Sequence, residues 1–500
     1  MKILFVASEI FPIVKIGGLA DVIGSLPTAL RETGVDVRVM LPAYKSVSSA
    51  VEWPASWHSL GDPLGAGPTR IGLTTAADGV PPLWLVDCPA LFDRNGGPYL
   101  DPDGRVWPDN HLRFALLARA AAMVCDAGAL IGWQPDILHA HDWHAGLAAA
   151  YLALRAGNRP ATLFTIHNLS YAGNFPGSCL EEVGLPPESF TPDGVEFHGQ
   201  LSFMKAGLRY SDHITTVSNT YAQEILTDEG GQGFGGLLRS RQDDLTGILN
   251  GIDNQTWNPA GDKLIEKNYD AARLKNKGKN KTALLEELGL TENGAPLFGV
   301  ISRLTEHKGL DLVLDALPRV MRLGAKIVVL GSGDRNIEQA FQLAESTYPD
   351  QFSLRLAYDE NLAHRIQAGA DFLLVPSRFE PCGLTQLYAL RYGTLPVVRR
   401  TGGLADTVID IATNTQGTGF VFAEADADAL LTAVRRAIEV YGKVRKWRSV
   451  QRQAMKQDFG WDVSASRYRT LYQDLIAHRG NGVLQTTTTK PLTSVREVTE

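Results

Sequence analysis

The segment KIGGLADV at residues 15–22 has the composition of an anion-binding loop. Gly17 and Gly18 lie between an apolar run that predicts a strand and a pattern that predicts a helix from about 19 to 33. Glycines at such a junction let the backbone approach a ligand and expose helix N-terminal N–H groups, which suit an anion. Lys15 would add a positive charge, whereas Asp21 could simply complement the helix dipole. A plain tight turn with Lys15 in solvent is the alternative interpretation.

A second copy of this motif, RTGGLADT, occurs at residues 400–407. A tandem repeat would show more than two copies at a short period, and this chain does not. We therefore expect each copy to begin a helix in a different domain, and both copies to face one shared site.

The segment SRLTEHKG contains two cations next to a predicted helix start. Arg303 and Lys308 follow the predicted strand PLFGVIS and precede the helical pattern GLDLVLDALPRV. Two cations beside a helix N-terminus can hold a diphosphate. Pairs of basic residues at this spacing are common, so the segment alone is a weak signal.

The segment SRFEPCGLTQLYAL contains a carboxylate next to another predicted helix start. Glu380 ends the loop and can accept hydrogen bonds from sugar hydroxyls, and an acid near an N-cap is the alternative interpretation. Cys382 is interpreted as a small buried residue rather than a nucleophile. The backbone N–H groups that would point out of this helix start belong to Gly383, Leu384 and Thr385.

The segment HAHDWHAG at residues 139–146 raises a metal hypothesis, because three histidines and an aspartate occur within six residues. The chain changes there from a predicted strand to a predicted helix, so these side chains need not converge, and we predict no metal site. Trp143, Tyr99 and Tyr171 offer flat faces on which a sugar can stack. Core packing explains each of these aromatic residues equally well.

The composition limits the possible classes of function. The chain has 500 residues, a net charge of −7 and a pI near 5.9, which do not favour a nucleic-acid or anionic-membrane partner. Its four cysteines indicate reduced thiols in a cytosolic protein. The start MKILFVASEI is predicted to be a buried strand and not a signal peptide, and no apolar run reaches the roughly 18 residues of a membrane span. A solvated surface is predicted for Lys275, Lys277, Lys279 and Lys281.

Short apolar runs alternate with helical patterns along the whole chain. Runs such as ILFVA, ILHAH and ATLFTIH in the first half, and KIVVLGSG and DFLLVPS in the second, predict strands buried on both faces. We therefore expect an α/β protein with two doubly wound, Rossmann-like domains facing each other across a cleft. Ligands of such sheets bind beyond the carboxyl ends of the strands. The Thr-rich segment after about residue 481 is predicted to be disordered.

The order of these motifs resembles that of bacterial glycogen synthases and plant starch synthases, from residue 1 to about residue 478. The matching segments are K-x-G-G-L-A-D-V, P-Y-x-D, HAHDWH, HN, NGID, SR-x₄-KG, EPCGLTQLYAL and TGGLADTV. The resemblance implies a retaining glucosyltransferase of the GT-B architecture that uses ADP-glucose. It implies an N-terminal acceptor domain over 1–245, a nucleotide-sugar domain over 246–458, a helix over 459–478 that crosses back onto the first domain, and a disordered tail over 479–500.

The resemblance also implies roles for individual residues. Lys15, Arg303 and Lys308 would meet the donor phosphates, Glu380 would bind glucose hydroxyls, and His167 would lie by the anomeric carbon, where its carbonyl can stabilise positive charge. Tyr358 would stack on adenine. Other donor contacts are expected from Gly17, Gly18, Asp21, Cys382, Gly383, Leu384, Thr385, Thr401 and Gly402. The residues expected to border the acceptor are Glu9, Tyr99, Trp143, His144 and Asn168.

The sequence departs from the usual family pattern in one place, because Ile16 stands where Thr is usual. The second glutamate of the broader retaining-transferase pattern is replaced by Tyr388, as in the synthases themselves. We expect donor binding and activity to survive both differences.

The expected reaction is transfer of glucose to the non-reducing 4-hydroxyl of an α-1,4-glucan such as glycogen, with retention, without a cofactor and in a bacterial cytoplasm. A UDP-glucose-dependent transferase and a catalytically inert glucan-binding protein remain alternatives. A nicotinamide-dependent oxidoreductase is a third, although no G-x-G-x-x-G follows the first strand. The oligomeric state stays open.

Overall fold

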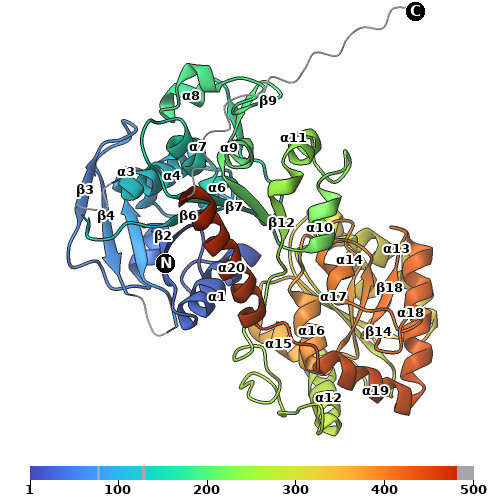
Figure 1. Cartoon of the computed structure of the whole chain (residues 1–500). Helices are drawn as coiled ribbons and strands as arrows, with labels where there is room; N and C mark the ends of the chain where they lie inside the picture. The colour runs from blue at the N-terminus through green and yellow to red at the C-terminus, as the bar shows by residue number, and fades with distance from the viewer. Residues whose placement is uncertain (76–78, 127–130, 481–500) are drawn as a thin grey trace, which may run out of the picture.

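The first half of the chain forms a nine-stranded sheet, seen on the left of Figure 1. The computed structural model describes residues 1–75, 79–126 and 131–480. Neighbouring strands are parallel except where β4 pairs with β3 and β5. The central strands are buried on both faces, which explains their continuous apolar runs. In spatial order the strands are β12 (Leu245–Gly247), β11 (His213–Thr216), β7 (Ala161–Ile166), β6 (Ile137–His141), β1 (Lys2–Val6), β2 (Asp36–Pro42), β5 (Leu83–Asp87), β4 (Thr69–Thr74) and β3 (His58–Gly61).

The second half forms a six-stranded sheet in which every pair of neighbours is parallel. In spatial order its strands are β15 (Phe352–Arg355), β14 (Lys326–Leu330), β13 (Leu297–Ile301), β16 (Phe372–Val375), β17 (Leu395–Arg399) and β18 (Phe420–Phe422). The expected fold class, with two Rossmann-like domains, is confirmed. Sequence reasoning did not identify β18, the antiparallel strands β3 and β4, or a small sheet of β8 (Asn174–Pro176), β10 (Gln200–Ser202) and β9 (Glu196–Phe197).

Helices cover both sheets. Apolar residues of α1 recur every three or four positions and are buried, which makes one face of the helix apolar. The helices of the first half include α1 (Gly18–Glu32), α2 (Lys45–Ser48), α3 (Pro89–Phe92), α4 (Asn110–Asp126), α6 (Asp142–Ala145), α7 (Leu147–Ala153), α8 (Cys179–Glu182), α9 (Phe203–Tyr210), α10 (Asn219–Glu224) and α11 (Gly235–Ser240). Those of the second half include α12 (Lys277–Leu288), α13 (Leu310–Arg322), α14 (Arg335–Thr347), α15 (Glu360–Gly369), α16 (Thr385–Tyr392), α17 (Gly402–Thr407), α18 (Ala427–Tyr441) and α19 (Val444–Met455).

The chain crosses between the two halves twice, and the crossings lie side by side. The N–H of Ile252 donates to the carbonyl of Phe459 (2.8 Å), and a bridge links Ile252 to Gly460. The second crossing leads into α20 (Trp461–Gly480), which packs against α1 of the first half (Figure 1). Tyr472 of this helix is fully buried, and its hydroxyl lies 2.8 Å from Nδ1 of His139.

The lysine cluster at residues 275–281, at the start of α12, corrects one expectation. Lys275 and Lys279 are exposed as predicted, but Lys277 and Lys281 are buried, with 5% and 7% of their surface accessible. Lys277 donates to the carbonyls of Gln367 and Ala368 and to the hydroxyl of Thr394, at 2.6–3.1 Å. Lys281 forms an ion pair with Asp371 (2.7 Å). Positions four apart lie on one face of a helix, so both lysines face the core.

Other expectations concern the cysteines, the tail and the membrane. The four cysteines are free and buried. The tail predicted to be disordered over 479–500 starts within α20, which continues to Gly480, and the remainder, from position 481 onward, lies outside the described residues. Among the described helices, none combines the length and the apolar character that crossing a membrane requires.

Candidate active site

The first glycine loop follows β1 and begins α1, as its composition predicted. Gly17 is the N-cap of α1. The carboxylate of Glu9, at the carboxyl end of β1, accepts hydrogen bonds from the N–H groups of Ile16 (2.6 Å) and Gly17 (2.9 Å). One of the two glycine N–H groups expected to meet an anion, that of Gly17, is therefore already bound by a carboxylate of the same domain.

Lys15 lies where the two halves of the chain approach each other. Its Nζ is 2.8 Å from Oδ1 of Asp21 and 3.5 Å from Oε2 of Glu360, in the first turn of α15. Burial alone would lower the pKa of Lys15, but the carboxylates of Asp21 and Glu360 raise it well above its usual value. The lysine is therefore a fixed positive charge at neutral pH. Tyr358 is exposed, and its hydroxyl donates to the same oxygen of Glu360 (2.9 Å).

A small cavity lies next to Lys15, on the side of the two crossings. Asp21 and Ser25 of α1 line it from the first half, and Glu360 and Tyr388 line it from the second. Trp461, at the start of α20, also lines it. Because both halves contribute walls, any change in their relative position changes this cavity.

The predicted cations of the second half have different partners. Lys308 forms an ion pair with Glu380 (Nζ to Oε2, 2.7 Å), and the same oxygen accepts from the hydroxyl of Ser377 (2.9 Å). Glu380 is buried, so this pair is only weakly screened by solvent. Arg303 instead reaches across to the first half, where Nη1 lies 3.4 Å from the hydroxyl of Tyr171.

The second glycine loop packs directly on the segment that contains Glu380. Gly402 has φ of +42°, and a Cβ built there would lie 2.0 Å from the carbonyl oxygen of Glu380. The N–H of Gly403 donates to that same oxygen (3.1 Å). Glycine is thus required at position 402 both by the backbone angle and by the available space.

A glutamate of the first half caps the second loop. Oε1 of Glu224, the last residue of α10, accepts from the hydroxyl of Thr401 (3.0 Å) and from the N–H of Gly402 (2.9 Å). Near it, the N–H of Thr220 donates to Asp406 (3.0 Å). The second loop is therefore bound to the opposite domain.

The segment 381–385 enters α16 beneath the second loop. Gly383 has φ of +70°, and the hydroxyl of Ser218, from the first half, donates to the carbonyl of Pro381 (2.6 Å). Burial raises the pKa of the Cys382 thiol to about 12, so it stays protonated. Leu384 faces the first glycine loop, because a Cβ on Gly18 would lie 3.7 Å from its Cδ1. Thr385 is the first residue of α16.

His167 follows β7, and its position is fixed by Asp142. Oδ1 of Asp142 accepts from the N–H groups of His167 (2.7 Å) and Asn168 (3.2 Å), which sets the orientation of both peptides. Nε2 of His167 lies 2.9 Å from Nδ1 of His141. Burial lowers the pKa of His167 to about 3, so the ring is neutral at neutral pH. Burial also raises the pKa of Asp142 to about 7.

The residues expected at the acceptor form a contiguous group in the first half. His144 stacks on Tyr99 with ring centroids 4.8 Å apart and packs against Trp143 at 4.1 Å. The hydroxyl of Tyr99 donates to Glu9 and lies 2.8 Å from the hydroxyl of Ser8. Aromatic faces and a buried carboxylate therefore continue from the first glycine loop into this group.

The histidines of HAHDWHAG have separate partners. His139 contacts Thr165 and Tyr472, His141 contacts His167, and His144 stacks on Tyr99. Among the described residues, the side chains grouped closely enough to hold a metal are others, namely His111, Cys179 and Glu182.

Sequence reasoning missed several residues that hold the site together. Glu360, Glu224 and Ser377 lie in ordinary helix or loop segments, without a motif that distinguishes them. Asp142 belongs to the segment HAHDWHAG, which the sequence suggested only as a possible metal site. Its signal is its place at the end of a buried strand, where a carboxylate can bind the N–H groups of a neighbouring strand end.

Comparison with known proteins follows the division into two sheets. Residues 2–240 match the family model described as the starch synthase catalytic domain, and residues 286–454 match the model for glycosyl transferases group 1. The chain is 50% identical to a glycogen synthase of Paramagnetospirillum magneticum over 96% of its length and 99% of that protein. It is 50% identical to a glycogen synthase of Serratia proteamaculans over 95% of its length and 100% of that protein.

Solved structures agree with these relatives. The catalytic domain of starch synthase IV from Arabidopsis thaliana, bound to ADP and acarbose, superposes with a TM-score of 0.84 at 34% identity, covering 95% of this chain and 99% of that one. A sucrose-phosphate synthase from Thermosynechococcus elongatus shares the fold at a TM-score of 0.59 and 18% identity, covering 95% of this chain and 99% of that one.

Proposed function

The chain belongs to the family of bacterial glycogen synthases and plant starch synthases, and we propose that it transfers glucose from ADP-glucose to the non-reducing 4-hydroxyl of an α-1,4-glucan such as glycogen, with retention. The observation that carries this proposal is the ion pair of Lys308 with the buried Glu380 beneath the second glycine loop. This pair supports the proposal because a cation and a carboxylate that can accept hydrogen bonds from sugar hydroxyls lie together in the second half, while Lys15 and the first loop belong to the first half.

Donor binding would rearrange the ion pairs of the site. Lys308 is neutralised by Glu380, and Lys15 by Asp21 and Glu360. A diphosphate arriving between Lys15, Arg303 and Lys308 would attract the lysines, and the carboxylate of Glu380 would then accept hydrogen bonds from glucose hydroxyls. Pairing these charges beforehand avoids leaving them buried without a partner, which costs about 3–5 kcal/mol for a buried pair.

The remaining donor contacts follow from position. Tyr358 is exposed beside Glu360 and is the proposed stacking partner of adenine. Gly18 and the side chain of Leu384 lie next to each other across the boundary between the halves, and both are proposed donor contacts. The other proposed donor contacts are Gly17, Asp21, Cys382, Gly383, Thr385, Thr401 and Gly402.

The proposed reaction is a front-face displacement. The bond from the anomeric carbon to the phosphate oxygen breaks, the acceptor 4-oxygen forms the new bond on the same face, and the hydroxyl proton moves to the departing ADP. His167 is neutral, and Asp142 fixes its peptide, so that its carbonyl can be directed at the anomeric carbon. The protein then contributes positioning and electrostatic stabilisation.

The acceptor is proposed to lie along the aromatic group of the first half. Tyr99, Trp143 and His144 supply stacked or packed faces, and Asn168 follows His167 directly. Both oxygens of Glu9 already bind the loop or Tyr99, so a glucan contact by Glu9 would be additional to these bonds.

We propose a first domain over 1–245, a second over 246–458 and a returning helix over 459–478, in a cytoplasmic enzyme. The domains would close over the donor about hinges near 246–253 and 458–462. The adjacent crossings at Ile252 and Gly460 support this hinge, because two neighbouring chain segments can bend together.

The test is incorporation of radiolabelled glucose into glycogen from ADP-glucose and from UDP-glucose at equal concentrations. Strong preference for ADP-glucose is the expected result. Transfer from UDP-glucose alone would preserve the reaction and change the donor. Glucan binding without transfer from either donor would identify an inert glucan-binding protein instead.

A further inference from the structure

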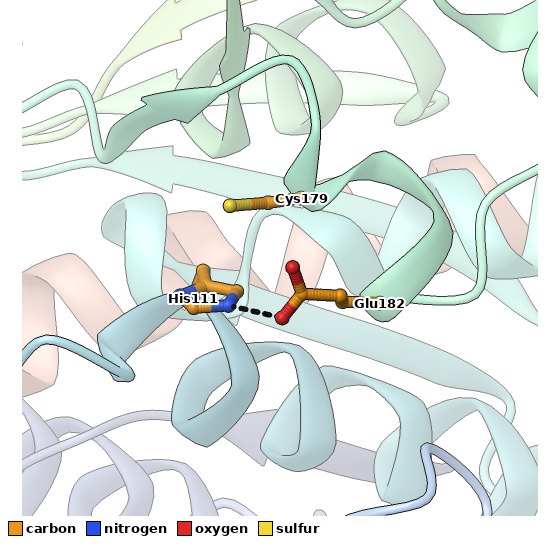
Figure 2. Close-up of side chains that lie close together, drawn as sticks. All are labelled: His111, Cys179 and Glu182. Atoms are coloured by element: carbon orange, nitrogen blue, oxygen red, sulfur yellow. Dashed lines mark hydrogen bonds and ion pairs between the residues drawn. The ribbon is translucent and has the colours of Figure 1, made fainter.

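Three metal-binding side chains meet in the first half, outside the proposed active site. His111 lies in the first turn of α4, and Cys179 and Glu182 are the first and last residues of α8. Figure 2 shows all three side chains converging on one region between the two helices. Their possible ligand atoms all lie within 4.8 Å of one another, and Nε2 of His111 is 3.0 Å from Oε2 of Glu182.

The local structure explains this convergence. Positions 179 and 182 are three apart in α8, so their side chains leave the same face of the helix. Cys179 is 7% exposed and His111 is 9% exposed, whereas the Glu182 side chain is 53% exposed. Two ligands are thus fixed by packing, and the third is free to adjust from the solvent side.

The set of donor atoms selects the kind of metal. A thiolate, an imidazole and a carboxylate together suit Zn²⁺, whereas Ca²⁺ and Mg²⁺ prefer oxygen ligands. Zinc bonds of about 2.0–2.3 Å in a tetrahedron place ligand atoms about 3.3–3.8 Å apart. The observed spread requires shifts of about 1 Å, which the exposed Glu182 can supply. One thiolate and one carboxylate would balance the charge of the ion.

We infer that His111, Cys179 and Glu182 form a zinc site that joins α8 to α4, with water as the fourth ligand. On binding, the S–H bond of Cys179 breaks, its proton goes to solvent, and sulfur bonds to zinc. The ion replaces the direct hydrogen bond between His111 and Glu182 with two bonds to the metal.

The site braces the acceptor side of the first domain. Asn110, next to His111, donates to the carbonyl of Tyr99 (3.1 Å). Phe175, which precedes α8 on β8, packs against both His111 and Trp143, each at 5.8 Å between ring centroids. Zinc would therefore restrict the two segments that support Tyr99 and Trp143. This consequence rests on the proposed function, whereas the metal site itself does not.

The first experiment measures metal binding by the full chain after removal of metals with a chelator. Cobalt(II) is added as a spectroscopic probe, and zinc content is measured after dialysis. We expect one ion per chain and a sulfur-to-cobalt charge-transfer band. The Cys179→Ser variant should lose the band, and His111→Ala should weaken zinc binding by at least about tenfold.

Matched variants keep this test decisive. Glu182→Gln keeps the side-chain volume at an exposed position, so it should fold even if Cys179→Ser does not, and it should also weaken zinc binding. Glu181→Gln removes the same charge from the neighbouring exposed position and should bind zinc like the unaltered chain. A band that survives in Cys179→Ser, or zinc uptake equal in Glu181→Gln and Glu182→Gln, would overturn the assignment.

A second measurement tests the brace. Zinc should raise the unfolding temperature of the unaltered chain and of Glu181→Gln, but not that of Cys179→Ser. In the transferase assay, loss of zinc should raise KM for glycogen several-fold and leave KM for ADP-glucose unchanged. Equal changes in both KM values would contradict the brace. Metal binding without transferase activity would leave the site in place and contradict only the proposed function.

Discussion

The two glycine loops of this molecule have nearly the same sequence and opposite attachments. In the first loop, the N–H groups of Ile16 and Gly17 are bound by Glu9 of the same domain. In the second loop, the hydroxyl of Thr401 and the N–H of Gly402 are bound by Glu224 of the other domain. The aspartates differ in the same way.

Asp21 of the first loop pairs with Lys15 of its own motif, whereas Asp406 of the second accepts from Thr220 in the opposite domain. The shared letters therefore specify a tight helix start in both places, but not what that start binds. The backbone of the first loop is capped within its own domain, and the loop reaches the other domain through the side chain of Lys15, 3.5 Å from Glu360. The second joins the two domains, so its bonds depend on how far they are closed.

Replacing Lys308, the cation beside the second loop, should have the largest effect of the changes considered, and the effect should be on kcat. The Lys308→Ala variant removes the cation beside the second loop, and kcat should fall by about 10²-fold or more, because the proposed reaction develops negative charge on the departing ADP at this position. Steady-state kinetics with ADP-glucose and glycogen measure the loss. Lys308→Arg serves as the charge-preserving control, and a loss under about tenfold in Lys308→Ala would place the leaving group elsewhere.

Acid should destabilise the first domain, which contains the first loop and two buried histidines. Burial lowers the pKa of His144 and His167 to about 3, so below the ordinary value of 6.5 the unfolded chain binds protons that the folded chain does not. Together these two histidines should lower the free energy of unfolding by about 3 kcal/mol between pH 6.5 and 5, and urea unfolding at both pH values measures the change.

Asp142 acts in the opposite sense. Its pKa is raised from 3.8 to about 7, so the folded chain holds a proton that the unfolded chain releases between these values, and stability rises as pH falls through 7. Asp142→Asn removes this contribution, so its stability should fall more steeply on acidification than that of the unaltered chain. Equal slopes would show that Asp142 is ionised in the folded protein.

Replacing a glycine by alanine should have different effects in the two loops, because the space around the added methyl group differs. A Cβ at Gly402 would meet the Glu380 carbonyl at 2.0 Å with φ at +42°, whereas a Cβ at Gly17 would meet no atom of the described residues within 4 Å. Gly402→Ala should lower the free energy of unfolding by about 1–3 kcal/mol. Gly17→Ala should change it by less than about 0.5 kcal/mol. Equal losses in thermal unfolding would remove this distinction.

The smallest expected difference is between replacing Glu224, which caps the second loop, and replacing Glu9, the glutamate that caps the first loop. Glu224→Gln weakens one side of a partly exposed cap and should lower stability by less than about 1 kcal/mol, but it should shift the domains apart. Small-angle scattering would detect a larger radius of gyration. Glu9→Gln should lower stability by about 1–2 kcal/mol, because its buried oxygens serve three donors, and leave the radius unchanged. A larger radius in Glu9→Gln and an unchanged radius in Glu224→Gln would show that Glu9, and not Glu224, holds the domains together.

Local pattern was enough to predict much of this molecule. Short continuous apolar runs predicted the central strands, and pairs of glycines that follow a predicted strand indicated both loops. The capping residues depend on contacts between distant segments. Glu224 reaches Gly402 across 178 positions, and Glu360 reaches Lys15 across 345, so no window of sequence contains either pair. Lys277 and Lys281 were misjudged because their charge suggested solvent, although their spacing of four places them on one helix face.

The return of α20 to the first domain affects the order in which the protein can fold. Tyr468 and Tyr472 belong to the core of the first domain, yet they follow the entire second domain in the chain. During synthesis the β-strands of the first domain therefore leave the ribosome well before α20, the helix that completes this domain. The second domain can finish folding as a continuous stretch of chain, whereas the first must wait for nearly the last described residue.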